Sequence, residues 1–521
     1  MSVKAGGRTG GAGSFYAMSG QITVFLSMLL CLALGVIGAL LEAARYAGAR
    51  MLTAAFSEGV TDSVFSEYDR LLLERYDVLF LDAAYNRIDF SPGNLSERAQ
   101  EYGAYYEMPQ KGVFGTYSRL WNIRMEDADV EQYVLATDDG AKSFRRQAAD
   151  YMRERLGTDL LQHFLELATK GSNPGELEEA LRQRERQSEE NLSAQEEIER
   201  ERRQMNPGQT EQTPTPEQEK WRANNPITVI RELKERGILA LVLPGCELSA
   251  YRRSLGLLPS HRALQVGTGI PSNEEISDTV WDRILCNEYY LEKFSHAADY
   301  GNGGAFPDDR FAYQIEYLLS GGESDQENLK GAVHQMLLMR EAANYMYLLS
   351  DQVKQLEAET AAWAIAGVTA AFPFMQAIKQ GILLAWAYGE SILDMRVLLT
   401  GGAVPIMKTG ESFRLSIDHL AVLLQPVDTG WGQTEDGLHY EDYLRMLMYF
   451  KDEKEMAMRA LDLIEMDIQG IAGGECFMAD HLIAGVKLKF KYVWEPLFCV
   501  GLPADHSFGK WRIGWSVPYS Y

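Results

Sequence analysis

An uninterrupted apolar run near the N-terminus dominates the hydrophobic pattern of the chain. Residues 22–41 (ITVFLSMLLCLALGVIGALL) contain no charged side chain. As a helix, this run would be about 30 Å long, which matches the hydrocarbon core of a bilayer. A buried core helix and a cleaved secretory signal are the alternatives, but the apolar part of a signal peptide has roughly 7–15 residues. The run therefore predicts a retained transmembrane helix.

Basic residues flank the predicted span on both sides. Lys4 and Arg8 precede it within residues 1–21, which contain no acidic side chain. Arg45 and Arg50 follow it. Basic residues concentrate on the cytoplasmic side of a membrane, and here the two counts are equal. We interpret residues 1–21 as a cytoplasmic leader and the rest as extracytoplasmic, which predicts a single-pass protein of the cell membrane.

Helical spacing continues beyond the span. Apolar residues between Leu52 and Leu72 recur at three- and four-residue steps, which predicts a helix with one apolar face. Residues 78–81 (VLFL) predict a short buried strand, and residues 144–170 predict a further helix. We therefore assign residues 42–170 to a helical juxtamembrane stalk and the first part of the ectodomain.

Charged and then proline-rich sequence interrupts this pattern. Residues 176–204 have too few apolar positions to bury a helix face, which favours a solvated helix or disorder. The segment NPGQTEQTPTPEQ at 206–218 has the composition of a flexible extended linker. We expect residues 171–226 to connect two parts of the chain and residues 227–521 to form the main ectodomain.

The main ectodomain has a largely helical pattern. An apolar run at 238–245 predicts a buried strand, and Ser324 and Glu327 have the spacing of a capping box that opens a helix. The apolar face of that helix would contain Leu329, Val333, Met336, Leu337, Met346 and Leu349. Residues 361–377 are uncharged but short and rich in alanine. We interpret them as a buried helix pair bent at Pro373 rather than as a second span.

The pattern changes to a period of two near the C-terminus. From Val486 to Trp494, apolar residues alternate with three lysines, which predicts a strand with one solvent face. Trp511, Ile513, Trp515 and Val517 repeat the alternation and predict a second strand that pairs with the first. Helices followed by terminal antiparallel strands indicate an α+β fold.

Composition and charge restrict the class of protein. The 521 residues are 46% hydrophobic and have a mean hydropathy of −0.23, which allows one span in a globular protein but excludes a polytopic membrane protein. There are 50 lysines and arginines against 74 aspartates and glutamates, so the formal charge is −24. Because this charge repels phosphate backbones, we expect no nucleic-acid partner.

The cysteines do not suggest a disulfide scaffold. Cys31 lies in the predicted span, and Cys246, Cys286, Cys476 and Cys499 allow three pairings among which the sequence does not choose. None of them forms a C-x-x-C pair. We interpret them as small buried residues rather than as metal ligands.

The chain has none of the common nucleophile, phosphate-binding or zinc motifs, and we predict no catalytic residue, no cofactor and no metal. Glu390 and Asp394 are four residues apart, so a helix would place both carboxylates on one face, where they could act as an acid–base pair. The structural alternative, which we favour, pairs one of them with Arg396 beside Trp386. The alternative hypothesis is a membrane-anchored extracellular hydrolase. Its candidate catalytic residues would be Glu390, Asp394, His439 and Asp428.

Residues 18–50, which include Gly20, the segment QITVF and Arg45, resemble the N-terminus of TadE/TadG-like pseudopilins of Flp-type pilus assembly systems. The remainder is similar to an uncharacterised, mostly gram-positive bacterial family of membrane-anchored proteins. Segments that carry this similarity include YDVLFLDAAY (76–85), LLAWAYGESILDMRVLLTGGAVPIMKTG (383–410) and GLHYEDYLRMLMYF (437–450).

The resemblance implies an accessory component of a pilus or of a type II-like secretion system. Pilins cut after a glycine usually have glutamate five residues later, but Phe25 occupies that position after Gly20, which favours a minor, non-polymerising component. We expect a non-enzymatic single-span protein whose partners are the lipid bilayer and subunits of the pilus or secretion system.

Overall fold

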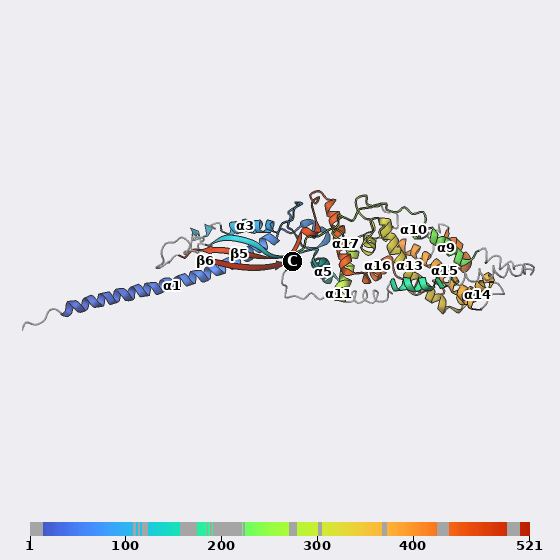
Figure 1. Cartoon of the computed structure of the whole chain (residues 1–521), viewed down its shortest axis with the longest axis horizontal. Helices are drawn as coiled ribbons and strands as arrows, with labels where there is room; N and C mark the ends of the chain where they lie inside the picture. Colours follow the sequence, from blue (N-terminus) through green and yellow to red (C-terminus); the bar gives the residue numbers. More distant parts are fainter. Residues whose placement is uncertain are drawn as a thin grey trace, which may run out of the picture.

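The computed structural model describes residues 14–107, 111–112, 115–116, 123–156, 175–184, 186–187, 190, 221, 224–269, 279–300, 305–366, 372–424, 437–496 and 511–521. Over these residues the molecule is elongated (Figure 1). A long helix, α1, projects at one end, an antiparallel sheet lies in the middle, and a body of helices forms the other end.

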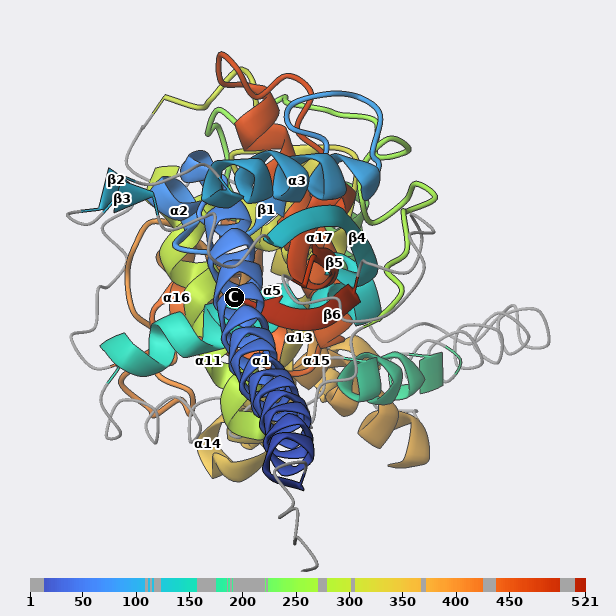
Figure 2. The ribbon, with the colours of Figure 1, turned by 90° about the vertical axis from the view of Figure 1, so that its left-hand side faces the viewer.

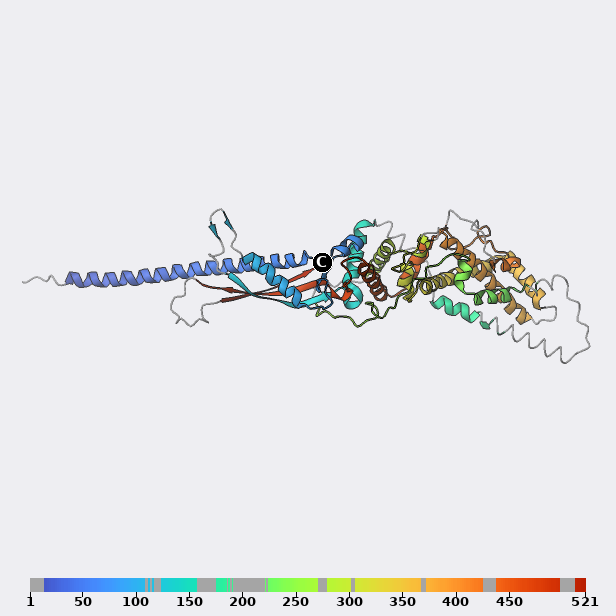
Figure 3. The same ribbon diagram turned by 90° about the horizontal axis from the view of Figure 1, so that it is seen from above.

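Helix α1 (Ser14–Phe65) contains the predicted span and the predicted amphipathic helix in one continuous element of 52 residues. Nearly all of residues 22–41 are exposed; Phe25 and Leu32, for example, keep 65% and 69% of their surface accessible. This bare part of α1 extends beyond the other described elements (Figure 3). Within the described residues, α1 alone is long and apolar enough to cross a membrane, which supports membrane anchoring by length and composition.

The central strand of the sheet is β5 (Leu482–Trp494), which pairs antiparallel with β4 (Ile123–Leu135) along one edge. Along its other edge, β5 pairs with β6 (Trp511–Ser520) and, at its start, with β1 (Leu81–Asp82). A separate hairpin joins β2 (Lys111–Gly112) and β3 (Gly115–Thr116). The sheet thus combines strands from both ends of the chain.

The alternating pattern of β5 produces one buried face and one solvent face, as predicted. Val486, Leu488, Phe490, Tyr492 and Trp494 are buried, whereas the intervening lysines are partly or fully exposed. Helix α1 and helix α3 (Gly93–Glu107) cover the apolar face of the sheet. The two helices and the sheet lie together in the view along the molecule (Figure 2). The predicted pairing of the two C-terminal strands is confirmed, with Phe490 opposite Trp515.

The helical body contains most of the remaining chain. Its α-helices are α2 (Arg70–Tyr76), α5 (Asp138–Arg155), α9 (Pro226–Glu235), α10 (Ile238–Val242), α11 (Val280–Lys293), α12 (Gln314–Ser320), α13 (Asp325–Ser350), α14 (Gln352–Ala366), α15 (Phe372–Leu399), α16 (Tyr440–Tyr449) and α17 (Glu453–Gln469). Short 3-10 helices are η1 (Ala297–Tyr300), η2 (Ile417–Leu424) and η3 (Ala479–His481). One apolar core joins these helices, and a second core joins the sheet to α1 and α3.

Several predictions for the helical body are confirmed in part. Ser324 caps α13, and its hydroxyl accepts a hydrogen bond from the amide of Glu327. Met346, placed on the apolar face by its spacing, is instead 59% exposed. The predicted pair of helices is present as α14 and α15, with Pro373 as the second residue of α15.

The prediction of a strand at residues 238–245 is wrong, because Ile238–Val242 form helix α10. A five-residue apolar run fits a buried helix turn as well as a strand, so periodicity could not separate them. Leu241 and Val242 are buried in the core of the helical body. The predicted strand at residues 78–81 is shifted, since the ladder begins only at Leu81.

Strand β4 was not predicted. Its solvent face contains the acidic residues Asp127, Asp129 and Glu131. Because of these charges, the sequence resembles a charged loop and its alternating pattern is difficult to recognise. The proposed connection at residues 171–226 lies mostly outside the described residues, so this boundary stays a prediction.

Candidate functional site

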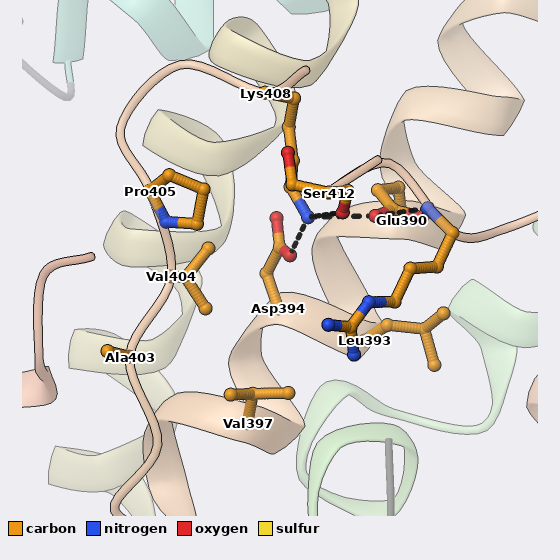
Figure 4. A pocket seen from close by; sticks show the side chains of 10 residues that line it. Glu390, Leu393, Asp394, Val397, Ala403, Val404, Pro405, Lys408 and Ser412 are labelled. Atoms are coloured by element: carbon orange, nitrogen blue, oxygen red, sulfur yellow. Dashed lines mark hydrogen bonds and ion pairs between the residues drawn. The ribbon is translucent and has the colours of Figure 1, made fainter. Parts of the chain in front are cut away.

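Glu390 and Asp394 lie one turn apart on α15 and are almost completely buried. Their carboxylates converge on Lys408, which comes from the loop after α15 (Figure 4). Lys408 Nζ lies 2.8 Å from Glu390 Oε1, 2.6 Å from Asp394 Oδ1 and 3.0 Å from the carbonyl oxygen of Ser412. The pair that the sequence placed on one face therefore shares one ammonium group.

Helix α13 supplies a second cation. The Nε atom of Arg340 donates to Asp394 Oδ2 at 3.0 Å, and Asn344 Nδ2 donates to the same oxygen at 3.0 Å. Arg340 Nη1 also donates to the carbonyl oxygens of Pro405 and Ile406 at 2.9 and 3.0 Å. Arg340 thus joins α13 to α15 and to the loop that carries Lys408.

The arrangement balances two cations against two anions. Glu390 Oε2 accepts from the amide of Leu415 at 2.8 Å, and Glu390 Oε1 accepts from the amide of Arg414 at 3.1 Å. Burial alone would raise the pKa of Asp394, but Arg340 and Lys408 outweigh it and lower this pKa. Asp394 is therefore held ionised, and both carboxylates are fully hydrogen-bonded within a fixed structure.

A small cavity adjoins this cluster, which we call the Lys408 cluster (Arg340, Glu390, Asp394 and Lys408). Its apolar lining includes Val397, Ala403 and Val404 (Figure 4). The cavity volume of about 20 Å³ leaves room for about one water molecule. Sites for small organic ligands are typically about 300 Å³ or larger, so this cavity is smaller than such a site.

The remaining candidate residues do not join this cluster. His439 is an exposed residue at the N-cap of α16, and its amide donates to Asp442 Oδ2 at 2.9 Å. Asp428 lies outside the described residues. The predicted pairing with Arg396 is wrong, because Arg396 donates to the carbonyl oxygens of Leu241 and Leu423.

Sequence reasoning missed two other buried polar groups in the helical body. Arg262 binds Glu465 and Asp480, which belong to α17 and η3. Asp462, also on α17, accepts hydrogen bonds from Ser260 and, at 2.7 Å, from the hydroxyl of Tyr317. Between 145 and 218 residues separate the partners along the chain, so no local spacing could have indicated them.

Thiols and potential metal ligands do not form a further site within the described ranges. Cys246 and Cys476 are free there, and Cys246 is exposed, whereas Cys286 is buried and its thiol donates a hydrogen bond to the carbonyl oxygen of Arg145 at 3.2 Å. Cys499 lies outside these ranges. No group of three or more histidine, cysteine, aspartate or glutamate residues among the described ones could hold a metal ion.

A family model matches residues 216–494; it describes a family of unknown function, DUF5702. The matched region contains the whole Lys408 cluster and β5, whereas α1 and β6 lie outside it. A search of curated proteins and a search of solved structures returned no match.

Proposed function

The chain belongs to this family of unknown function, and we propose that it is a non-enzymatic, single-span membrane protein that acts as an accessory or minor pseudopilin-like component of a Tad/Flp-type pilus or a type II-like secretion system. One observation carries the proposal. The same helix, α1, provides the exposed apolar segment and the surface on which the sheet packs.

The two functions of α1 follow each other closely along the helix. Ala49 is the first buried residue between residues 22 and 65, only eight positions after Leu41. An enzyme that needs only to be kept near a membrane is served by a flexible tether. A continuous helix instead fixes the ectodomain relative to whatever surrounds the apolar segment, as an assembly subunit requires.

The Lys408 cluster supports a non-enzymatic role. Its carboxylates are engaged by Arg340, Lys408 and backbone amides, and the adjoining cavity holds about one water molecule. The hydrolase alternative requires at least one available acid or base beside a substrate-sized space. The resemblance of residues 18–50 to TadE/TadG-like pseudopilins supports the pilus or secretion system as the place of action, and Phe25 after Gly20 favours a minor component.

Topology is the first test. Protease added to intact protoplasts should digest the chain after Arg50 and leave a membrane-bound N-terminal fragment, since we place the acidic bulk outside. Complete protection of the C-terminal strands would contradict this orientation. N-terminal mass spectrometry of the same preparation should show an intact leader for a permanent anchor, whereas a start at Gln21 would indicate processing as in pilins.

The partner is the second test. A photo-crosslinking amino acid at Val36, which is 53% exposed on α1, should form adducts with a second helical subunit in intact cells. The matched control places it at Leu257, which is 82% exposed but lies in the helical body. Adducts with lipid alone at position 36 would contradict the assembly role and leave only a membrane anchor.

A further inference from the structure

Aromatic side chains gather where α1 meets the sheet. The ring centroids of Tyr46 and Trp494 lie 5.5 Å apart, those of Tyr46 and Trp511 lie 6.0 Å apart, and those of Trp494 and Trp511 lie 6.4 Å apart. Trp494 is buried, whereas Trp511 keeps 56% of its surface exposed. We call these three residues the aromatic foot of the sheet.

The aromatic foot lies at a defined height on α1. Tyr46 follows Leu41 by five residues, which corresponds to about 7 Å along a helix. The headgroup layer beside the hydrocarbon core is about 5–8 Å thick. If residues 22–41 fill the core, the foot lies in the headgroup layer, and the strands lead away from the membrane along α1 (Figure 3).

The chemistry of the foot suits that layer. Tryptophan and tyrosine concentrate at membrane interfaces because an apolar ring and a polar tip match the two sides of the boundary. Because Trp511 keeps 56% of its surface exposed, its ring can contact lipid without any change in the sheet. The exposed ring of Trp511 therefore has a partner in lipid that water does not provide.

Two of the neighbouring arginines are already paired with carboxylates. Arg45 pairs with Glu42 at 3.0 Å, and Arg512 pairs with Glu126 at 3.0 Å. An electrostatic lipid-binding surface would instead present several cations toward anionic headgroups. Contact through the aromatic rings, by contrast, does not require anionic lipid.

We propose that Trp511, held by its ring contacts with Tyr46 and the buried Trp494, seats the end of the sheet in the phospholipid headgroup layer, so that the ectodomain stands on the bilayer in one orientation. This inference rests on the membrane anchoring in the proposed function and goes beyond it by assigning the sheet, not only α1, a lipid contact. The helical body then lies at the far end of the molecule from the membrane (Figure 1).

The test uses the full chain, one copy per bilayer disc, with phosphatidylcholine brominated either near the headgroup or deep in the acyl chains. Bromine quenches tryptophan fluorescence at contact distance. Headgroup-side bromine should quench the wild-type chain more strongly than deep bromine. W511F should lose more than half of this quenching, although eight of the nine tryptophans remain. The matched control is W363F, because Trp363 is 45% exposed on α14 in the helical body and should leave the quenching unchanged.

The other outcomes contradict the inference in distinguishable ways. Equal quenching of wild type and W511F, with the chain still resistant to carbonate extraction, overturns the lipid contact and leaves the anchor intact. Extraction of the chain by carbonate overturns the anchoring itself. Quenching that appears only with added phosphatidylglycerol, an anionic lipid, would show that charge rather than aromatic contact holds the sheet at the membrane. No quenching of Trp511 in single-copy discs, with burial of Trp511 on adding further copies, assigns the ring to a subunit interface instead.

Discussion

In the sheet, paired charges lie on the solvent face, whereas the helical body also contains ion pairs within its core. Lys487 and Lys491 on β5 face Glu131 and Asp127 on β4 in pairs that remain open to water. Lys408, Arg340 and their carboxylate partners are almost fully shielded. The same residue types therefore meet at similar distances in two different dielectric environments.

The difference decides what each set of charges does. In water, an ion pair gains little because solvent screens it and the side chains lose entropy. In the interior, both charges have already lost their hydration, so removing one partner leaves an uncompensated charge. The exposed pairs keep the solvent face polar, whereas the Lys408 cluster determines how α13, α15 and the following loop are arranged.

The largest effect should follow from Lys408→Met. This substitution leaves Glu390 and Asp394 without their shared ammonium group, and breaking a buried pair typically costs about 3–5 kcal/mol. Urea unfolding of the full chain in detergent, followed by circular dichroism, should show this loss in the helical transition. An unchanged midpoint would mean that water or another cation takes the place of Lys408.

A smaller effect is expected where α1 joins the sheet. Thr53 accepts a hydrogen bond from the indole N–H of Trp515 at 2.9 Å, and Thr53→Val leaves that donor unpaired at a cost of about 1–2 kcal/mol. Hydrogen exchange in β6 should accelerate. Thr61→Val is the matched control, because the Thr61 hydroxyl donates within its own helix, to the carbonyl oxygen of Ser57 at 2.8 Å. Equal acceleration in both variants would show that the Trp515 contact does not hold α1 on the sheet.

The pH dependence of the helical body offers a third effect. Burial raises the pKa of Asp462 from 3.8 to about 6, against the opposing hydrogen bonds from Ser260 and Tyr317. The folded chain therefore binds this proton more tightly than the unfolded chain. This contribution to the free energy of unfolding is fully present below the pKa of Asp462 in the unfolded chain. It is lost as the pH rises through the pKa of Asp462 in the folded chain.

Asp462→Asn removes this titration. The stability advantage of wild type over the variant should fall by about 1 kcal/mol between about pH 5 and about pH 7.5. Urea midpoints measured across this range provide the test. A constant difference between the two chains would show that Asp462 does not titrate in this window.

The smallest effect should follow from Lys491→Met on the exposed face of the sheet. Lys491 contacts Asp127 and Asp129, but solvent screens these pairs, so we expect no measurable change in unfolding. A loss as large as that of Lys408→Met would remove the distinction between the two regions.

Elements with a strong local pattern were predictable. The uncharged run of residues 22–41 predicted a long apolar helix, and the alternation from Val486 to Trp494 predicted a half-buried strand. Both patterns repeat over many consecutive residues. They can therefore be recognised from the local sequence, without knowing which distant element packs against them. The Ser324 cap was also local, because its hydroxyl contacts an amide three residues away.

Elements that depend on distant partners were not predictable. Strand β4 has an acidic solvent face, and its inward residues indicate a strand only once β5 lies beside it. Glu390 and Asp394 were recognised as a pair, but their cations come from α13 and from a loop that no spacing rule connects to them. Arg396, the nearest cation in sequence, binds backbone carbonyls instead.

The sequence by itself determined where the chain is apolar enough to leave water and where helices and terminal strands form, because these properties depend on neighbours within a few positions. Only the tertiary structure decided that α1 continues from the bare segment into the core of the sheet, that residues 123–135 complete that sheet, and that Lys408 and Arg340 neutralise the carboxylates of α15. The physical reason is that buried charge and strand pairing are compensated by whichever groups folding brings near, not by those adjacent in the chain.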